Sequence, residues 1–213
     1  MDSSEYEQGS AEWFQARCGR ITASRIADVM AQNKNGSWSS KRTDYLWELV
    51  EERITGQCIA KYVNAAMQWG TETEPEAREF FEGRYDLEVE TTGFILHPEM
   101  DYAGASPDGL IGVDSILEIK CPTTKTMLQT LKDNQPDERY VLQCQWQMAC
   151  TKSRYAWLVY YDPRLPIEMC MKRFFIERDF ALITRIENAV LDFNKEVNDT
   201  ILALKENARE HTS

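Results

Sequence analysis

The sequence predicts an α/β domain in which a mixed central β-sheet is flanked by helices and followed by a long amphipathic helix. Runs rich in β-branched and aromatic residues lie between residues 87 and 176, and helix-length segments with apolar residues three and four apart surround them. No repeat or flexible linker divides the 213 residues. We therefore expect residues 1–213 to form one domain with a single large core and flexible ends at residues 1–10 and 205–213.

The composition is typical of a soluble globular protein, with 43% hydrophobic and 28% charged residues. No apolar run approaches the roughly 18 residues that a membrane span needs, and the acidic, polar start of the chain does not resemble a signal peptide. Six cysteines occur without a C-x-x-C pair, which indicates free thiols in a reducing cytoplasm. With only two histidines, a His/Cys zinc site is not expected.

The net charge of −11 is unfavourable for binding nucleic acid, because phosphates are normally neutralised by Lys and Arg. The charge is uneven, however. Between residues 17 and 42, Asp28 is the only acidic residue among six basic ones, which are Arg17, Arg20, Arg25, Lys34, Lys41 and Arg42. This segment therefore predicts a locally basic groove on an acidic protein.

A β-hairpin is predicted at residues 102–122, where two short apolar runs flank a turn at residues 112–115. Glu118 and Lys120 are two residues apart on the second strand, so their side chains point to the same face, and Ile119 points to the other. Asp108 stands near the start of the first strand, and pairing across the turn brings it beside Glu118. Two carboxylates and an ammonium group are expected on one patch.

This patch suits a hard divalent cation such as Mg²⁺, which prefers oxygen ligands. The carboxylates of Asp108 and Glu118 and the Ile119 carbonyl are candidate ligands, and Lys120 is placed to orient a water or to offset phosphate charge. Metal-assisted attack of water on a phosphodiester is the corresponding chemistry. The alternative is a surface strand with a Glu–Lys pair. The preceding Ser-Pro-Asp-Gly and the ten-residue spacing favour the metal site.

Two further segments allow either a functional or a structural interpretation. Thr22 or Ser24 is predicted to cap a helix that contains Ile26, Val29 and Met30, with Arg17 and Arg20 just before it, so this helix end is either an anion pocket or an ordinary cap. Thr71 and Glu74 have capping-box spacing, with Pro75 in the first turn of a helix. Glu74 is then either a capping residue or a third carboxylate for the metal.

The remaining elements follow from periodicity and turn residues. Helices are predicted at 42–55, 71–85, 139–150 and 180–204, strands at 87–96, 102–105, 155–161 and 167–176, and polar loops at 32–41 and 123–138. Gln143 and Gln147 lie one turn apart on the helix at 139–150, so their amides share a face. They can hold a water or a phosphate, or simply form a polar surface.

Several of these segments resemble, in the same order, the phage lambda exonuclease and YqaJ-type viral recombinase nucleases of the PD-(D/E)xK superfamily. The similar segments are ITAS at 21–24, WGTETEPEAR at 69–78, SPDGL at 106–110, LEIKCP at 117–122 and QCQWQM at 143–148. The similarity extends from Trp13 to the IERD sequence at 176–179, which is most of the chain. It implies a restriction-endonuclease-like fold.

The resemblance also implies a role for individual residues. Asp108 corresponds to the aspartate that bridges two Mg²⁺ ions, Glu118 and the Ile119 carbonyl to the other ligands of one ion, and Glu74 to the carboxylate of the second ion. Lys120 corresponds to the lysine that positions the attacking water, and Gln143 to a glutamine beside it. The pocket for the 5′-phosphate of the digested strand corresponds to Arg17, Ser24 and Ser106.

The activity implied by the resemblance is Mg²⁺-dependent 5′→3′ exonuclease digestion of one strand of linear double-stranded DNA, with Mn²⁺ as a second usable metal. The products are 5′-mononucleotides and a 3′ single-stranded tail for annealing-type recombination. The implied assembly is a homotrimeric ring around DNA ends that works with a single-strand annealing protein, in the cytoplasm of a bacterial host and encoded by a phage or prophage. Further DNA contacts are expected at Arg20, Lys34, Trp38, Lys41 and Arg42.

Two alternatives remain open from the sequence. One is a structure-specific or site-specific DNA endonuclease of the same fold. The other is a non-catalytic DNA-end-binding protein, against which the complete acidic set argues.

Overall fold

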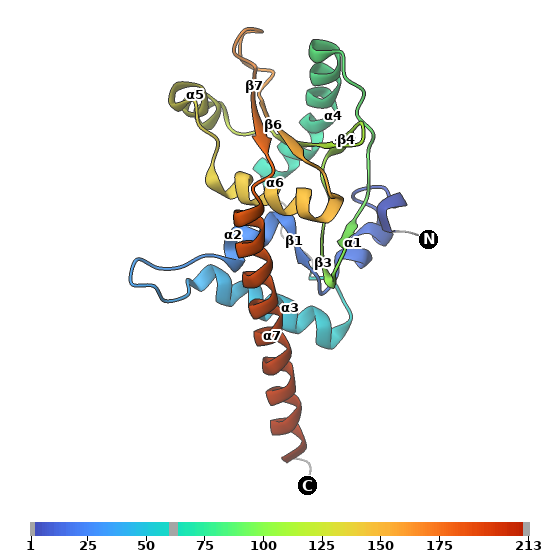
Figure 1. Cartoon of the computed structure of the whole chain (residues 1–213), viewed down its shortest axis with the longest axis vertical. Coiled ribbons are helices and arrows are strands. Elements are labelled where there is room, and N and C mark those ends of the chain that lie inside the picture. The colour runs from blue at the N-terminus through green and yellow to red at the C-terminus, as the bar shows by residue number, and fades with distance from the viewer. Residues whose placement is uncertain (1–2, 60–63, 211–213) are drawn as a thin grey trace.

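The structure is a computed structural model that describes residues 3–59 and 64–210. It has the predicted α/β architecture, with strands in the middle of the chain and helices around them (Figure 1). The helices are η1 (Ser3–Glu5, a 3-10 turn), α1 (Ala11–Arg17), η2 (Ala23–Arg25, also 3-10), α2 (Ile26–Val29), α3 (Ser40–Thr55), α4 (Ala65–Tyr85), α5 (Thr124–Asp133), α6 (Glu138–Thr151) and α7 (Phe180–Glu210). The strands are β1 (Ile21–Thr22), β2 (Ile95–His97), β3 (Met100–Ala105), β4 (Gly109–Ile111), β5 (Ser115–Lys120), β6 (Tyr155–Tyr161) and β7 (Met171–Glu177).

The strands form two hydrogen-bonded sheets, and both are mixed. In the smaller sheet, of order β1-β3-β2, β3 is parallel to β1 and antiparallel to β2. In the larger sheet, of order β4-β5-β6-β7, only the β5–β6 pair is parallel. The two sheets are joined by residues 106–108, which lead from β3 into β4. The predicted mixed sheet is therefore confirmed, although it is divided at this connector.

The larger sheet is covered by helices on both faces, as a sheet buried on two sides requires. Leu117 and Ile119 of β5 pack with Ala77 and Phe81 of α4. Ile116, on the opposite face of β5, packs in a cluster with residues of α5 and α6. Alternate residues of β5 thus face different helices, and Glu118 and Lys120 share the face of Ile116.

A third apolar cluster joins the smaller sheet to the helices around it. It combines buried side chains from β1, α2, β3, α3, α6 and α7. The rings of Tyr45 in α3 and Phe193 in α7 stack with centroids 5.5 Å apart. Beyond this cluster the end of α7 projects from the body of the molecule (Figure 1). No helix within the described part of the chain is both long and apolar enough to cross a membrane.

The central hairpin is confirmed. Gly109, Leu110 and Ile111 of β4 pair with Leu117, Ile116 and Ser115 of β5, respectively. Gly112 has a φ of +57°, which explains a glycine at this turn, because other residues rarely adopt that conformation. The six cysteines are free thiols, as predicted.

The predicted start of the helix at Thr71 is wrong. α4 begins one and a half turns earlier, where the Asn64 side chain accepts a hydrogen bond from the backbone N–H of Met67 at 2.9 Å. Pro75 lies inside the helix rather than in its first turn. A mid-helix proline loses one backbone hydrogen bond, and the burial of Ala77 and Phe81 against the sheet compensates for this loss.

The predicted strand at 87–96 is reduced to Ile95 and Leu96, which begin β2, and to an isolated bridge between Glu90 and Leu110. The backbone of this segment is hydrogen-bonded to residues near the start of the chain and not to a strand. Gly93 N–H donates to the Ser4 carbonyl, and Phe94 N–H donates to the Ser3 carbonyl. A Cβ at Gly93 would lie 2.3 Å from the Tyr6 carbonyl oxygen, so only glycine permits this approach.

The two ends of the chain are more ordered than expected within the described residues. Residues 3–10 were predicted to be flexible, but residues 3–8 are held against residues 92–94 and against the Pro107 carbonyl. We call residues 3–8 the N-terminal strap. At the other end, α7 continues to Glu210 rather than ending at Leu204.

The predicted loop at 123–138 contains the helix α5. Thr123 caps it, accepting from the backbone N–H of Thr126 at 3.3 Å, and Met127 is fully buried. The helix was missed because threonine and lysine residues dominate its sequence, so the apolar stripe is narrow. The helices predicted at 42–55 and 139–150 and the strands predicted at 102–105 and 155–161 are present, with boundaries within two residues of the prediction. The strand predicted at 167–176 begins only at Met171.

His97 gives the fold a pH dependence that can be measured. The imidazole is buried beside Trp146, with ring centroids 4.9 Å apart, and its Nδ1 accepts a hydrogen bond from the backbone N–H of Glu99. Burial lowers its pKa below 6.5, although Glu187 opposes this effect. The unfolded chain therefore binds a proton more readily than the folded one as the pH falls below 6.5.

We expect the free energy of unfolding to decrease between pH 7.5 and 5.5, because His97 must stay neutral in the folded state. Urea denaturation at several pH values measures this slope, and His97→Gln should have a shallower slope than the wild type. Equal slopes would assign the pH dependence to other groups.

Candidate active site

Asp108 is placed beside Glu118 by the hairpin register. Gly109 pairs with Leu117, so extending the antiparallel register by one residue sets Asp108 opposite Glu118. The Asp108 carboxylate Oδ2 accepts a hydrogen bond from the backbone N–H of Ile119 at 2.6 Å. The aspartate therefore continues the pairing of the two strands through its side chain, which fixes its position next to β5.

Glu118 is almost fully buried, with 2% of its surface exposed. Its Oε1 atom accepts from Gln143 Nε2 and lies 2.5 Å from Lys120 Nζ, and its Oε2 atom accepts from Gln147 Nε2 at 2.5 Å. Both glutamines come from α6, one turn apart. A buried polar group needs hydrogen-bond partners, and here α6 supplies two donors to this carboxylate.

Lys120 is held on the same face as Glu118. Its Nζ atom lies 4.5 Å from the centre of the Tyr140 ring. Burial disfavours the ammonium form, but Glu118 and Asp108 outweigh it and raise the pKa of Lys120 above its ordinary value. Lys120 is therefore positively charged at neutral pH.

Glu74 reaches the same region from α4. Its Oε1 atom accepts from Arg78 at 2.7 Å, one helical turn later. Glu74, Arg78 and Asp108 line a cleft of about 450 Å³, and the N-terminal strap together with residues 91–93 forms the rest of its lining. Gln8 of the strap donates to the Pro107 carbonyl at 2.8 Å, immediately before Asp108. The lining thus comes from four separate parts of the chain, which are the strap, α4, residues 91–93 and Asp108.

The electrostatics show that the three carboxylates interact. Burial, followed by the charges of Glu118 and Glu74, raises the pKa of Asp108 well above its ordinary value. Burial also raises the pKa of Glu74, and Glu118 adds to this effect while Arg78 opposes it. Carboxylates that repel one another in a cleft are a common feature of catalytic and cation-binding sites.

The donor set fits Mg²⁺ in its chemistry. Asp108, Glu118, Glu74 and the Ile119 carbonyl offer only hard oxygen ligands, and the raised pKa values mean that a cation would relieve their repulsion. In the arrangement seen here, Glu74 is turned to Arg78 and Glu118 to Lys120. Among the residues that the structure describes, no three His, Cys, Asp or Glu side chains already converge as metal ligands. The metal-binding roles of these residues stay predictions.

The predicted phosphate pocket is assembled in part. Arg17 Nη1 donates to Ser106 Oγ at 3.1 Å, and Trp13 Nε1 donates to the same oxygen at 3.0 Å. The Arg17 guanidinium lies over the Trp13 ring, 4.2 Å from its centre, and burial lowers the pKa of Arg17. An arginine that is partly removed from water and donates to a serine hydroxyl is suited to binding an anion.

Ser24 follows β1, which pairs in parallel with β3. Thr22 pairs with Gly104, so Ser24 and Ser106 each follow the paired residues by two positions. Ser24 is exposed, and its hydroxyl lies 3.5 Å from that of Thr22. The predicted helix N-terminus is a 3-10 turn followed by the four-residue α2, without a side-chain cap. The predicted cap by the side chain of Thr22 or Ser24 is therefore absent, and the anion pocket at this helix end stays a prediction.

Two of the six basic residues of the predicted groove at 17–42, Arg25 and Arg42, are ion-paired within the fold. Arg25 pairs with Asp28 at 2.7 Å and with Glu48 at 2.6 Å. Arg42 is buried, paired with Glu196 at 2.5 Å and bonded to the Val29 carbonyl. Arg42 was predicted to contact DNA, but its guanidinium is used within the fold, where it also stacks on the rings of Trp38 and Phe193.

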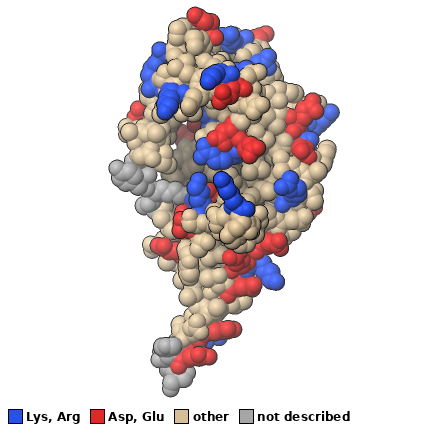
Figure 2. Space-filling model, turned by 90° about the vertical axis from the view of Figure 1, so that its left-hand side faces the viewer, with Lys and Arg blue, Asp and Glu red and all other residues tan. Residues whose placement is uncertain are grey.

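Lys34, Trp38 and Lys41 remain exposed on or beside the loop between α2 and α3, so their predicted DNA contacts stay predictions. This loop is a small hairpin, with a bridge between Gln32 and Trp38. Figure 2 shows most of the Lys and Arg side chains of one face on its upper half, where Asp and Glu side chains lie among them, whereas acidic side chains predominate along the tapering lower part.

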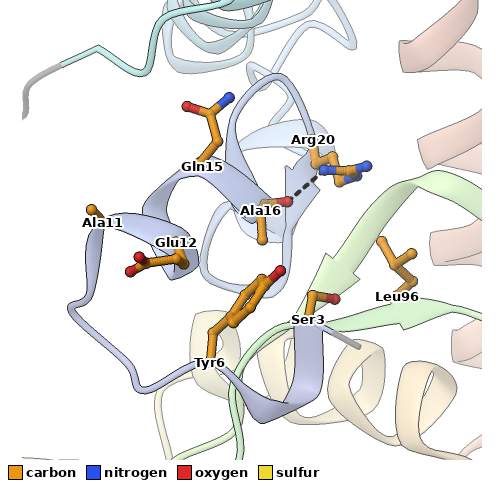
Figure 3. Close-up of a pocket in the computed structure, with 8 residues that line it drawn as sticks. All are labelled: Ser3, Tyr6, Ala11, Glu12, Gln15, Ala16, Arg20 and Leu96. Atoms are coloured by element: carbon orange, nitrogen blue, oxygen red, sulfur yellow. Dashed lines mark hydrogen bonds between the residues drawn. The ribbon is translucent and has the colours of Figure 1, made fainter. Parts of the chain in front are cut away.

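Arg20 lies away from the cleft, beside a second cavity. Its guanidinium donates to the carbonyls of Ala16 and Asp101, and so ties α1 to β3. The cavity, of about 580 Å³, is bounded by α1, the N-terminal strap and β2 (Figure 3). A DNA contact by Arg20 remains a prediction, and the hydrogen bonds seen here give the residue a structural role.

Sequence reasoning assigned no site role to three residues of these pockets. Trp13 shares Ser106 with Arg17, Arg78 holds Glu74, and Gln8 supports the Pro107 carbonyl. Arg78 could have been found from its i,i+4 spacing to Glu74. Trp13 and Gln8 act across about 90 residues, and no local pattern indicates such contacts.

Comparisons with known proteins agree with this geometry. Residues 12–154 match the model of the YqaJ-like viral recombinase domain. The chain is 43% identical to an alkaline exonuclease (LHK-Exo) from Laribacter hongkongensis, with a TM-score of 0.87 over 94% of this chain and 99% of that one. The structure of LHK-Exo in complex with dAMP gives the same identity and coverage and a TM-score of 0.88.

A phage-related exonuclease from Haemophilus somnus has the same fold at 16% identity, with a TM-score of 0.67 over 87% of this chain and 96% of that one. No curated protein matches the chain. The family match covers well over half of the 213 residues and includes Glu74, Asp108, Glu118, Lys120 and Gln143. The chain belongs to the YqaJ-like viral recombinase domain family.

Proposed function

We propose that this protein is a Mg²⁺-dependent exonuclease that digests one strand of linear double-stranded DNA from its 5′ end. The products would be 5′-mononucleotides and a 3′ single-stranded tail suited to annealing-type recombination. The observation that carries the proposal is that Asp108, Glu118 and Lys120 lie together on the hairpin, with Glu74 close enough to raise the pKa of Asp108. Ser106, which Arg17 contacts, stands two residues before Asp108 in the chain. The 43% identical alkaline exonuclease supports the proposal.

In this reaction each side chain has a defined task. Asp108, Glu118, Glu74 and the Ile119 carbonyl would hold two Mg²⁺ ions, which stabilise charge on the attacking and leaving oxygens of an in-line displacement. Lys120 orients the attacking water and offsets negative charge on the phosphate. Gln143 keeps the Glu118 carboxylate in place. The protein supplies positions and charges rather than a covalent intermediate.

The direction of digestion would follow from the anion pocket at Arg17 and Ser106, with Ser24 nearby. Each cleavage leaves a new 5′-phosphate, which can enter the pocket before the next cleavage. By the same family resemblance we propose that three copies form a ring around the DNA and that a single-strand annealing protein receives the tail. Mn²⁺ is expected to replace Mg²⁺.

The most direct test is a Mg²⁺ titration with linear duplex DNA and covalently closed circular duplex as parallel substrates. We expect 5′-mononucleotides to appear from the linear DNA in proportion to bound Mg²⁺, and the closed circle to remain intact. Cleavage of the circle would instead indicate an endonuclease of the same fold. Binding of DNA ends without any cleavage would indicate a non-catalytic end-binding protein.

A second prediction concerns the 5′-phosphate. Duplexes with a 5′-hydroxyl should be digested about 10- to 100-fold more slowly than 5′-phosphorylated ones, since one charged hydrogen-bonded contact is worth about 1.5–3 kcal/mol. Arg17→Ala should slow digestion of phosphorylated ends and remove most of this preference. Initial rates on both end types measure it.

The matched control for that experiment is Arg154→Ala, because Arg154 is an exposed arginine whose side chain contacts Asp114 and Tyr155. This variant should keep the preference. Equal rates of the wild type on both end types would remove the Arg17 pocket from the mechanism.

A further inference from the structure

The two oxygens of the Glu118 carboxylate have unequal surroundings. Oε1 has two partners, Gln143 Nε2 and Lys120 Nζ, each at 2.5 Å. Within the described residues, Oε2 accepts only from Gln147 Nε2, also at 2.5 Å. A carboxylate oxygen offers about two acceptor positions. Oε1 is therefore saturated, whereas Oε2 retains one acceptor position.

Gln147 determines where that remaining position points. The three donors hold the carboxylate from both ends, so the Glu118 side chain cannot rotate about its terminal bond without losing one of them. An ionised carboxylate accepts hydrogen bonds but donates none, so Gln147 must present its NH₂ group to Oε2. The orientation of the Gln147 amide follows from this chemistry.

The hydrogen bond from Gln147 Nε2 to Glu118 leaves the other polar atom of the Gln147 amide, Oε1, without a partner in the described structure. The Gln147 side chain is completely buried. An unsatisfied buried acceptor destabilises a fold, and a methionine, which is of similar length, would leave no such acceptor. Packing alone therefore does not explain a glutamine here, whereas a contact with Glu118 does.

We propose that Gln147 is a positioning residue that directs the Oε2 atom of Glu118 toward a bound divalent cation. This inference rests on the proposed function, because it assigns Gln147 to the metal site of that reaction. Gln143 and Gln147 then have different tasks. Gln143 and Lys120 both donate to Oε1 of Glu118, which is saturated. Gln147 orients Oε2, the oxygen that remains available to bind the metal.

The test compares Gln147→Met with Gln145→Met in the full chain. Gln145 lies on the same helix and is also buried, but its amide holds the Glu177 carbonyl and the Asp179 N–H, away from Glu118. Mg²⁺ binding is measured by titration calorimetry, and nuclease rates are measured as a function of Mg²⁺ concentration. Gln147→Leu serves as a second variant with a different shape.

We expect Gln147→Met and Gln147→Leu to bind Mg²⁺ about 10- to 100-fold more weakly, as is usual when a residue that supports a metal ligand is removed. Their nuclease rates should recover in part at high Mg²⁺, because the metal dependence changes more than the maximal rate. Gln145→Met should melt at a lower temperature and keep the wild-type affinity for Mg²⁺.

Wild-type Mg²⁺ affinity in both folded Gln147 variants would overturn the inference while leaving the proposed function intact. Weaker binding in Gln145→Met of the same size would also overturn it, because the effect would then follow from damage to α6. If the wild type neither binds Mg²⁺ nor cleaves DNA, the proposed function itself fails, and that result is known before any variant is compared.

Discussion

Lys120→Ala is expected to lower the rate of DNA cleavage by about 10³-fold at saturating Mg²⁺, the typical effect of removing a group that assists proton transfer or stabilises charge. Lys120 is charged at neutral pH, because Glu118 and Asp108 outweigh the effect of its burial. It is also held at a fixed place, 2.5 Å from Glu118 and over the Tyr140 ring. No other lysine side chain in the described residues contacts these carboxylates.

DNA binding by this variant should change little, because the proposed contact of Lys120 is with the reacting phosphate alone and not with the rest of the duplex. Fluorescence anisotropy with a labelled duplex in Ca²⁺ measures binding, and product release measures cleavage. Lys125→Ala is the control, because Lys125 is exposed on α5. Full activity of Lys120→Ala would exclude the lysine from the mechanism.

Asp108→Asn is expected to abolish cleavage and, at the same time, to make the metal-free protein more stable. Asparagine keeps an oxygen that can accept the hydrogen bond from Ile119 N–H, but it removes the central carboxylate of the site. It also removes the repulsion with Glu118 and Glu74. We expect Tm in EDTA to rise by about 2–4 °C, the shift that 1 kcal/mol produces in a domain of this size.

The direction of the expected change in stability follows from the pKa of Asp108. Burial and two neighbouring carboxylates raise the pKa of Asp108 above 3.8, its ordinary value in an unfolded chain. The folded state therefore binds this proton more tightly, and ionisation of Asp108 destabilises the fold as the pH rises from 3.8 through the folded-state pKa. The stability advantage of Asp108→Asn should appear over that range and be complete above it.

Thermal unfolding of both proteins in EDTA, from pH 4 to pH 8, measures the difference. Addition of Mg²⁺ should stabilise the wild type and leave Asp108→Asn unchanged, because only the wild type retains the site. A variant that is less stable than the wild type at neutral pH would show that the Asp108 charge contributes favourably to the fold.

The centre of the site was predictable because it depends on local geometry. Residues 108–120 form a hairpin whose turn sets the register, and the register sets Asp108 against Glu118. The spacing of two between Glu118 and Lys120 gave their common face, and the spacing of four between Gln143 and Gln147 gave their common direction. The structure brings these groups together over distances that sequence patterns describe.

Predictions from the sequence failed where contacts with distant segments outweighed local conformational preferences. Residues 91–94 alternate like a strand, but their backbone pairs with the N-terminal strap instead of a sheet. Pro75 indicates a helix start on local grounds, yet packing of α4 against β5 carries the helix through it. Arg42 seemed available to DNA because its partner, Glu196, lies 154 residues away in the sequence.

The N-terminal strap has a practical consequence for work with this protein. Its residues form part of the lining of the cleft at Glu74 and Asp108, and its backbone passes close to Gly93. An affinity tag or fluorophore fused ahead of the strap would therefore sit within reach of incoming substrate. Attachment after α7, whose end projects from the opposite part of the molecule (Figure 1), keeps a label clear of the reaction.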